Sequence, residues 1–388
     1  MSNIKAIGAY QKYVEKLTNG TLTVVDTKQQ IINRYSNLFN KYSLRTSDGV
    51  FIKDPSQNNQ IVSEGQAYWQ LLSVGLARID TANARKYQND FDALLKGTQY
   101  MIKLAKDAGN GGEFPAWKVK QSGGTVVLDK DQYGPTANSA SDADIDSVRS
   151  LIYAQELVER GIWVDRGYNK LLDKLIPAAQ NLFRDQNGLR VLRPSEDWDG
   201  FHFTDYLDPA AYKEIAAYLA KHKKPNAAFW EKAANDSIAL YGEILNDTKT
   251  FPAHINITRG NATTSPWLPN TDVKAANNTV MTYDGIRSPW RIARYIILYP
   301  ETSKEARVAC EAIVHGQNNN FRHTSSVEMD AAMYLPLSVA LGHSSATELA
   351  KRVLNGISAD KYYENTLILL GLVDTLYPRQ VNINNVKP

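Results

Sequence analysis

Residues 61–72 read Ile61-Val62-Ser63-Glu64-Gly65-Gln66-Ala67-Tyr68-Trp69-Gln70-Leu71-Leu72. Ser63 is a favoured helix N-cap residue and Gln66 follows three positions later, so the stretch predicts a capping box at the start of a helix. Tyr68 and Leu72 recur at helical spacing, which predicts a helix with one buried face. Glu64 is expected in the first turn, where an acidic residue is ordinary because it favours the helix dipole.

The same helical period continues over most of the chain, and alternating strand patterns are few. It predicts an all-α protein of about a dozen helices, mostly paired by short loops, at residues 5–18, 26–42, 64–80, 84–106, 142–160, 165–184, 206–221, 227–246, 288–298, 303–316, 328–341, 345–355 and 360–373. Longer loops, which are the usual place for function, are expected at 43–62, 107–140, 185–205 and 248–283.

No linker or change of composition divides the chain, so we expect a single domain over residues 1–380 and a loose tail at 381–388. Paired helices could stack into an open solenoid or close into a ring of hairpins. The sequence has no repeat of fixed period, which favours the irregular closed form.

The composition excludes several classes of partner. With 388 residues, of which 43% are hydrophobic, the chain can fill a sizeable core. Its net charge of +3 arises from 44 basic and 41 acidic residues without a basic block, which gives no support for nucleic acid or an anionic membrane. No run reaches the roughly 18 apolar residues of a membrane span, and the start lacks the apolar core of a signal peptide.

The sequence also contains no recognisable motif for binding a metal or a cofactor. Cys310 is the only cysteine, which excludes an internal disulfide and a cysteine metal cluster. The histidines are isolated from one another and from acidic partners, so we expect no zinc site. Phosphate loops and serine nucleophile elbows are also missing from the sequence, and we expect no cofactor.

A second carboxylate repeats the placement of Glu64. Ser141 is a predicted cap, Asp144 takes the third helical position, and Asp142 stands where Glu64 stands in its own helix. A calcium loop that starts at Asp142 is the alternative, but its sixth position is Ser147 rather than Gly and its twelfth is not Glu. The spacing therefore disfavours calcium.

A third carboxylate, Asp284, precedes a helix whose start is marked by Ser288 and Pro289. Arg287 follows it by three positions, so a local surface ion pair of little energetic value is the simplest interpretation of this site alone. If antiparallel pairs form a ring, however, the starts of alternate helices gather at one end. The three carboxylates would then face one cleft.

Two carboxyls held apart across a cleft suit the hydrolysis of a glycosidic bond, where one donates a proton and the other activates water or attacks. A helix start favours the ionised form of Glu64, which opposes an acid role. A neighbouring Asp142 carboxylate, together with desolvation by Tyr68 and Trp69, would help Glu64 to keep a proton.

At these three stretches the sequence resembles glycoside hydrolase family 8, a family of inverting enzymes that includes endoglucanases, xylanases and lichenases. The stretches that carry the resemblance are Ser63-Glu64-Gly65-Gln66, Ser139-Ala140-Ser141-Asp142-Ala143-Asp144 and Tyr283-Asp284-Gly285-Ile286-Arg287. The resemblance implies an (α/α)6 barrel with six inner and six outer helices. It also implies that Glu64 is the general acid, that Asp142 binds and distorts the sugar, and that Asp284 is the base.

Lesser similarities lie in the loops. Trp117, in Phe114-Pro115-Ala116-Trp117-Lys118, resembles a family tryptophan beside the cleft, and Tyr206 aligns with a tyrosine that touches the distorted sugar. The chain departs from the family just before Tyr206, because Phe203-Thr204-Asp205 stands where Asn-Pro-Ser is common. The residues expected to contact substrate are Trp117, Trp198, Tyr206 and Trp290 as stacking platforms, with Tyr68, Tyr283 and Arg287.

The sequence thus predicts an inverting hydrolase of β-1,4-linked glucan that acts on a polysaccharide or oligosaccharide and is a monomer. A xylanase, a mixed-linkage β-glucanase or a non-catalytic polysaccharide-binding relative are the alternatives. The family resemblance implies a secreted or periplasmic protein, although no signal peptide is visible in the chain.

Overall fold

The computed structural model describes residues 3–131, 134–186, 188–197, 202–248, 250–257, 267–269, 284–299, 304–316, 326–355 and 361–379. Within these ranges the chain forms thirteen α-helices, and every helix expected from the periodicity is present. The largest boundary error is at α6 (Tyr168–Gln180), which was expected at 165–184. The expected tail at 381–388 lies outside the described residues. None of the helices in the described ranges is long and apolar enough to cross a bilayer.

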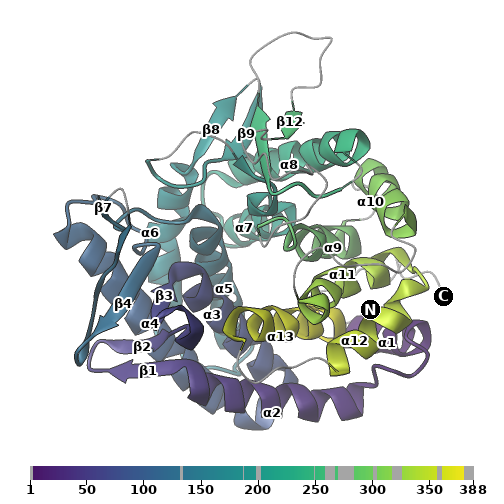
Figure 1. The fold of residues 1–388 in the computed structure, drawn as a ribbon, viewed down its shortest axis with the longest axis horizontal. Coiled ribbons are helices and arrows are strands. Elements are labelled where there is room, and N and C mark those ends of the chain that lie inside the picture. Colours follow the sequence, from purple (N-terminus) through teal and green to yellow (C-terminus); the bar gives the residue numbers. More distant parts are fainter. Residues whose placement is uncertain are drawn as a thin grey trace.

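Six alternate helices form a closed inner ring in the described part of the chain (Figure 1). Each packs against the next one, and the last packs against the first. In ring order they are α3 (Ser63–Ile79), α5 (Ser141–Glu159), α7 (Pro209–Lys221), α9 (Ser288–Leu298), α11 (Val327–Leu341) and α13 (Tyr362–Leu376).

A second set of helices covers the ring from outside. Its members are α2 (Val24–Tyr42), α4 (Ala84–Asp107), α6, α8 (Ala227–Thr248), α10 (Lys304–Gly316) and α12 (Ser345–Asn355). The first helix, α1 (Asn3–Leu17), packs against α13. The chain is therefore an (α/α)6 barrel, as the family resemblance implied.

The residue pattern explains which helices lie inside. The inner helices α3 and α13 are buried around nearly their whole circumference, as expected for helices that are apolar on all sides. Gly371 of α13 faces α11 so closely that an added Cβ would lie 2.3 Å from the carbonyl oxygen of Ala332. Outer helices such as α12 instead bury one stripe, which includes Leu349 and Val353.

Short antiparallel strands lie in the long loops, where the sequence pattern had predicted few. They are β1 (Ser43–Thr46), β2 (Gly49–Ile52), β3 (Gln60–Val62), β4 (Lys118–Ser122), β5 (Thr125–Leu128), β6 (Lys130–Asp131), β7 (Gly134–Pro135), β8 (Phe183–Gln186), β9 (Leu189–Leu192), β10 (His202–Phe203), β11 (His254–Ile257) and β12 (Trp267–Pro269). β3 pairs with β4 and leads directly into α3. The loops thereby fix the start of α3.

Candidate active site

Arg287 lies immediately before α9, and its buried side chain contacts carboxylates from three other segments of the chain. Its Nη1 atom contacts Glu64 Oε1 and lies 3.2 Å from Asp142 Oδ2. Its Nη2 atom contacts Asp205 Oδ2 and lies 3.7 Å from Asp284 Oδ1. We call these five residues the Arg287 cluster. The cluster brings together the three carboxylates expected from the sequence.

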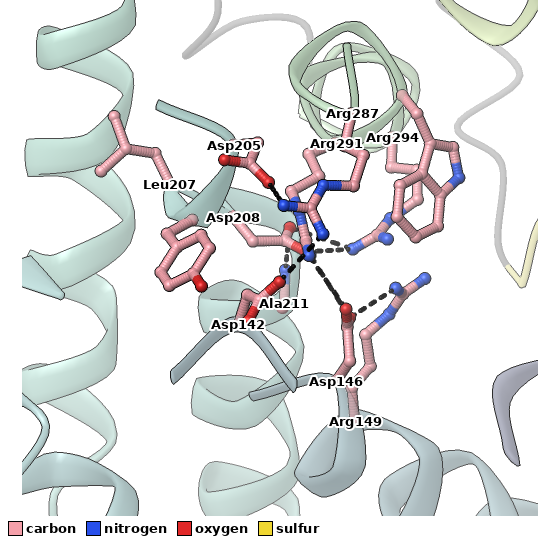
Figure 2. A network of polar contacts seen from close by, with 12 residues as sticks. Asp142, Asp146, Arg149, Asp205, Leu207, Asp208, Ala211, Arg287, Arg291 and Arg294 are labelled. Carbon is pink, nitrogen blue, oxygen red and sulfur yellow. Dashed lines mark hydrogen bonds and ion pairs between the residues drawn. The ribbon is translucent and has the colours of Figure 1, made fainter. Parts of the chain in front are cut away.

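This arrangement corrects the simplest interpretation of Asp284 and Arg287. Arg287 is not part of a surface pair, because its side chain is 3% exposed. Figure 2 shows its guanidinium pointing toward Asp205, which comes from the short helix η3 (Thr204–Tyr206) that precedes α7. Helix starts from α3, α5 and α9 therefore meet at one end of the ring, as the antiparallel pairing predicted.

The capping box expected at Ser63 does not form. Val62 is the N-cap of α3, no side chain bonds to the free backbone donors there, and Ser63 Oγ has no hydrogen-bond partner in the described ranges. The Gln66 side chain instead accepts a hydrogen bond from Ile52 N at 2.7 Å and donates one to Val50 O at 3.0 Å. Gln66 therefore fastens β2 to α3 rather than capping the helix.

The capping box expected at Ser141 does not form either. Ala140 is the N-cap of α5, and it makes no side-chain cap bond. Asp144 is fully buried, and burial raises the pKa of its carboxyl well above its usual range. Asp144 is thus a buried carboxyl beneath the start of the helix.

The four carboxyls of the Arg287 cluster differ in their access to solvent. Asp142 is 2% exposed and Asp205 is fully buried. The side chains of Glu64 and Asp284 are 20% and 45% exposed. Glu64 and Asp284 are therefore the members of the cluster that are most open to solvent.

Burial also changes the acidity of the two inner carboxyls. It raises the pKa of Asp142 to about 6, against the Arg287 charge and with help from Glu64. Burial likewise raises the pKa of Asp205 well above its usual range, again against Arg287. One guanidinium shared by four carboxyls is too little charge to keep all of them ionised.

Tyrosines surround the Glu64 carboxylate. The Tyr363 hydroxyl, from the start of α13, donates to Glu64 Oε1 at 3.3 Å. The Tyr68 hydroxyl accepts a hydrogen bond from Arg287 Nη1 at 3.2 Å. Burial raises the pKa of both phenols well above their usual range, so both remain protonated. Tyr363 could not be identified from the sequence, because it lies in an ordinary apolar helical stretch.

Gly65, in the first turn of α3, lies close to Tyr362 of α13. A Cβ atom on Gly65 would lie 2.0 Å from the Tyr362 hydroxyl, so a larger residue there would require this buried tyrosine side chain to shift. The loop of Trp117 closes the other side, since Ser63 N donates to Trp117 O at 2.9 Å. Glu64 thus projects from a tightly held turn.

A second ionic group lies deeper in the ring, and sequence reasoning missed it. This Arg291 network consists of Arg149, Arg291, Arg294, Asp146, Asp208 and Glu214, drawn in part in Figure 2. A signal was present: Arg287, Arg291 and Arg294 have the i, i+4, i+7 spacing of one helix face.

Charges in the Arg291 network are closely matched. Arg291 donates to Asp146 Oδ2 at 3.0 Å and to Asp208 Oδ2 at 2.7 Å, and Arg294 donates to both oxygens of Asp208 at 3.0 Å. Arg149 donates to Glu214 at 3.1 Å. Burial opposes ionisation, but Arg294 and Arg291 hold the pKa of Asp208 below its usual range.

Apart from Tyr68, the aromatic residues expected to contact the substrate fall into three groups. Trp117 and Tyr206 are half-buried, and the Tyr206 ring lies 4.6 Å from that of Phe203 between ring centres. Trp198 and Tyr283 lie outside the described residues. The prediction that Trp290 stacks on a sugar is wrong, because its side chain is fully buried and presents no face to a sugar.

Trp290 serves the barrel interior instead. Its Nε1 atom donates to Asp374 Oδ2 at 2.7 Å, and the guanidinium carbons of Arg291 and Arg294 both lie 5.3 Å from its ring centre. Cation–π contacts of this kind stabilise buried arginines.

Chemically, the site offers a pair of solvent-accessible carboxyls on either side of a buried cation. Such a pair can supply one proton donor and one proton acceptor. Among the described residues, no group of three or more His, Cys, Asp or Glu side chains has the geometry to hold a metal ion.

Comparison with known proteins gives one family and one fold. The family model for Glycosyl hydrolases family 8 matches residues 10–376. The structure is similar to a β-1,3-1,4-glucanase from Paenibacillus sp. X4, with a TM-score of 0.71 and 19% identity over 93% of this chain and 94% of that chain. No match was found among curated proteins.

Two further solved structures give similar results. A reducing-end-xylose-releasing exo-oligoxylanase in complex with xylose has a TM-score of 0.69 and 15% identity, over 94% of both chains. The family 8 endoglucanase Cel10 from Klebsiella pneumoniae has a TM-score of 0.59 and 17% identity, over 87% of this chain and 97% of that chain. At such identities these matches confirm the barrel fold.

Proposed function

Because the chain belongs to glycosyl hydrolase family 8, we propose that it is an inverting endo-β-1,4-glucanase. In this proposal Glu64 donates a proton to the leaving glycosidic oxygen while Asp284 takes a proton from the attacking water. Asp142 holds the sugar at the cleavage point.

The observation that carries the proposal is the geometry of the Arg287 cluster. Glu64 and Asp284 contact different nitrogens of one guanidinium, and they are the solvent-accessible carboxyls among the four. This placement of the guanidinium supports two carboxyls with a gap between them, and an inverting enzyme needs a gap of roughly 6.5–9.5 Å to accommodate water.

An acid must hold a proton near the pH of reaction. In the Arg287 cluster four carboxyls share one cation, and like charges at short range disfavour full ionisation. Asp142 lies in this coupled group, and burial raises its pKa to about 6.

Asp142 is suited to hold a sugar rather than to transfer its proton. Its Oδ2 atom accepts from Arg287 at 3.2 Å, whereas its buried Oδ1 atom has no hydrogen-bond partner among the described residues. A buried acceptor without a partner is costly, and a sugar hydroxyl would satisfy it.

Xylan and mixed-linkage glucan are the second candidates for substrate. The similar structures include a mixed-linkage glucanase and an exo-oligoxylanase, alongside an endoglucanase. The half-buried Trp117 and Tyr206 suit stacking on any of these sugars, because each has an apolar ring face.

The decisive experiment measures reducing-sugar release from carboxymethylcellulose, lichenan, xylan and chitosan, with Glu64→Gln and Asp284→Asn as inactive controls. We expect the fastest release from carboxymethylcellulose, and an α-anomeric first product by nuclear magnetic resonance. A β-anomeric product would refute inversion. Binding of oligosaccharides without release from any polymer would show a non-catalytic relative.

A further inference from the structure

A small pocket lies between the inner helices, away from the proposed active site. Its wall includes Arg149, Glu214, Arg294, Leu298, Asp374 and Arg379. Leu298 ends α9 and Arg379 follows the end of α13, whereas the Arg287 cluster lies at the starts of both helices. Arg294 follows Arg287 by seven residues, which places it roughly 10 Å farther along α9. We call this the Arg294 pocket, and the proposed reaction gives it no role.

Arg294 has hydrogen-bond donors to spare in this pocket. Its Nη2 atom donates to both oxygens of Asp208 at 3.0 Å. Its Nη1 and Nε atoms have no hydrogen-bond partner among the described residues, although the side chain is only 8% exposed. A buried charged donor without a partner costs free energy, and an arginine does not avoid that cost by losing its proton. A ligand that accepts hydrogen bonds would therefore be stabilised beside Arg294.

The carboxyls of the wall already have donors. Glu214 accepts hydrogen bonds from Arg149 Nε at 3.1 Å and from the Tyr153 hydroxyl at 2.6 Å. Burial opposes the ionisation of Glu214, but the neighbouring arginines hold its pKa below the usual range. Asp374 Oδ2 accepts from Trp290 Nε1 at 2.7 Å. In the described part of the wall, the buried polar atoms left without a partner are thus donors.

Positive groups also outnumber negative ones in the wall. It contains three guanidiniums and two carboxyls, from Arg149, Arg294, Arg379, Glu214 and Asp374. Asp208, which contacts Arg294, is shared with Arg291 and does not line the pocket. Glu156 likewise contacts Arg379 from outside the wall. A water could accept from Arg294, but an anion also offsets the positive charge of the wall.

The size of the pocket selects a monatomic anion. Its cavity volume is about 20 Å³, and one water needs about 10–15 Å³ of such space. A halide ion is only slightly larger than a water, whereas sulfate, phosphate and carboxylates carry several heavy atoms. We propose that the Arg294 pocket binds one chloride ion, held by Nη1 and Nε of Arg294. The ion would join side chains of α5, α7, α9 and α13, and so help to hold four inner helices together.

Bromide locates the site, because it replaces chloride and scatters X-rays anomalously. Crystals of the whole chain grown in sodium bromide should show an anomalous peak in contact with Nη1 or Nε of Arg294. Density there without an anomalous signal would show a water and overturn the inference. A peak without chloride binding in solution would show an adventitious ion only, and would overturn it as well.

Chlorine magnetic resonance measures binding in solution, because a bound chloride broadens the signal of the free ion. We expect the wild-type protein to broaden the signal and added bromide to reverse the effect. Arg294→Lys keeps a positive charge opposite Asp208 but lacks the spare guanidinium donors. It should therefore bind chloride about tenfold more weakly. Equal broadening by the two proteins would overturn the inference.

Arg307→Lys is the matched control, because it makes the same replacement at an arginine of α10 that pairs with Glu311. It should bind chloride as the wild-type protein does, and a loss equal to that of Arg294→Lys would overturn the specific role. Leu298→Phe covers the case in which Arg294→Lys folds poorly. It fills the pocket from the apolar part of the wall, so it should also lose chloride binding. Unchanged binding in Leu298→Phe would contradict the assignment.

The melting temperature gives a third measurement. At a chloride concentration about ten times the dissociation constant, it should rise by about 1–2 °C more than in sodium gluconate of equal ionic strength. Equal rises in the two salts would show general screening of charge and overturn the inference. None of these measurements involves hydrolysis, so the chloride site and the proposed function are tested separately.

Discussion

Arg287 and Arg291 lie one helical turn apart in the chain, yet their surroundings differ in charge balance. Arg287 is shared by four carboxyls, of which Glu64 and Asp284 reach solvent. Arg291 is fully buried within a network whose arginines and carboxylates are closely matched. Carboxyls thus outnumber the cation in the proposed site, whereas charges are balanced in the network that joins the inner helices.

The two regions also respond to pH with opposite signs. Burial raises the pKa of Asp142, so its contribution to stability is present at low pH and is lost as the pH rises. The arginines around Asp208 lower its pKa, so its contribution is present above the usual range of aspartate and is lost as the pH falls. Asp142 of the Arg287 cluster thus favours the fold at low pH, whereas Asp208 of the Arg291 network favours it at higher pH.

The largest effect should come from Asp284→Asn. We expect kcat to fall by about 10³-fold, because the variant lacks the proposed base, while oligosaccharide binding and the melting temperature stay unchanged. The measurement is steady-state kinetics with calorimetric binding, and Asp107→Asn, at an exposed surface pair, is the control. Retained turnover would place the base elsewhere.

The next effect belongs to the Arg291 network. Asp208→Asn leaves two buried arginines without their shared carboxylate, so the free energy of unfolding should fall by about 3–5 kcal/mol. Activity per folded molecule should stay close to that of the wild-type protein. Urea denaturation measures the first quantity and active-site titration the second. A variant that is stable but inactive would show that Asp208 serves the reaction and not the stability of the fold.

Asp142→Asn should stabilise the protein while impairing hydrolysis. Burial raises the pKa of this carboxyl from 3.8 to about 6, so the ionised form is disfavoured in the fold by about 1–3 kcal/mol at pH 7. The gain in the free energy of unfolding should be largest at pH 7 and nearly vanish at pH 4. Denaturation at the two pH values checks this, and an equal gain at both would contradict it.

The smallest effect separates two tryptophans. Trp117→Ala should raise KM about fivefold, worth about 1 kcal/mol of stacking, with little change in stability. Trp290→Phe should leave KM unchanged and lower the free energy of unfolding by about 1–2 kcal/mol, since it removes the hydrogen bond to Asp374. A change of KM in Trp290→Phe would instead support the prediction that Trp290 contacts the sugar.

The helices could be predicted from the sequence because their burial imposes a period on it. The gathering of Glu64, Asp142 and Asp284 followed from antiparallel pairing, which is a property of the whole chain. The strands could not be found in the same way: β4 and β5 are short, and only the Gly123-Gly124 turn marks their hairpin.

Side-chain partners were harder to predict than elements. Ser63 and Gln66 have the residue types of a capping box. The Gln66 side chain, however, forms hydrogen bonds with the backbone of β2 instead. Arg287 looked like a surface residue because local sequence does not show that a ring closes over it. Tyr363 lies 299 residues from Glu64, and no local pattern joins them.

This separation has a consequence for synthesis. Glu64 belongs to the first inner helix to leave the ribosome, and Tyr363 to the last, which closes the ring by packing against the first. A nascent chain therefore lacks a complete site until α13 has emerged. A chain released before α13 would lack Tyr363 beside Glu64 and the contact that closes the ring, so the proposed activity should depend on the whole barrel.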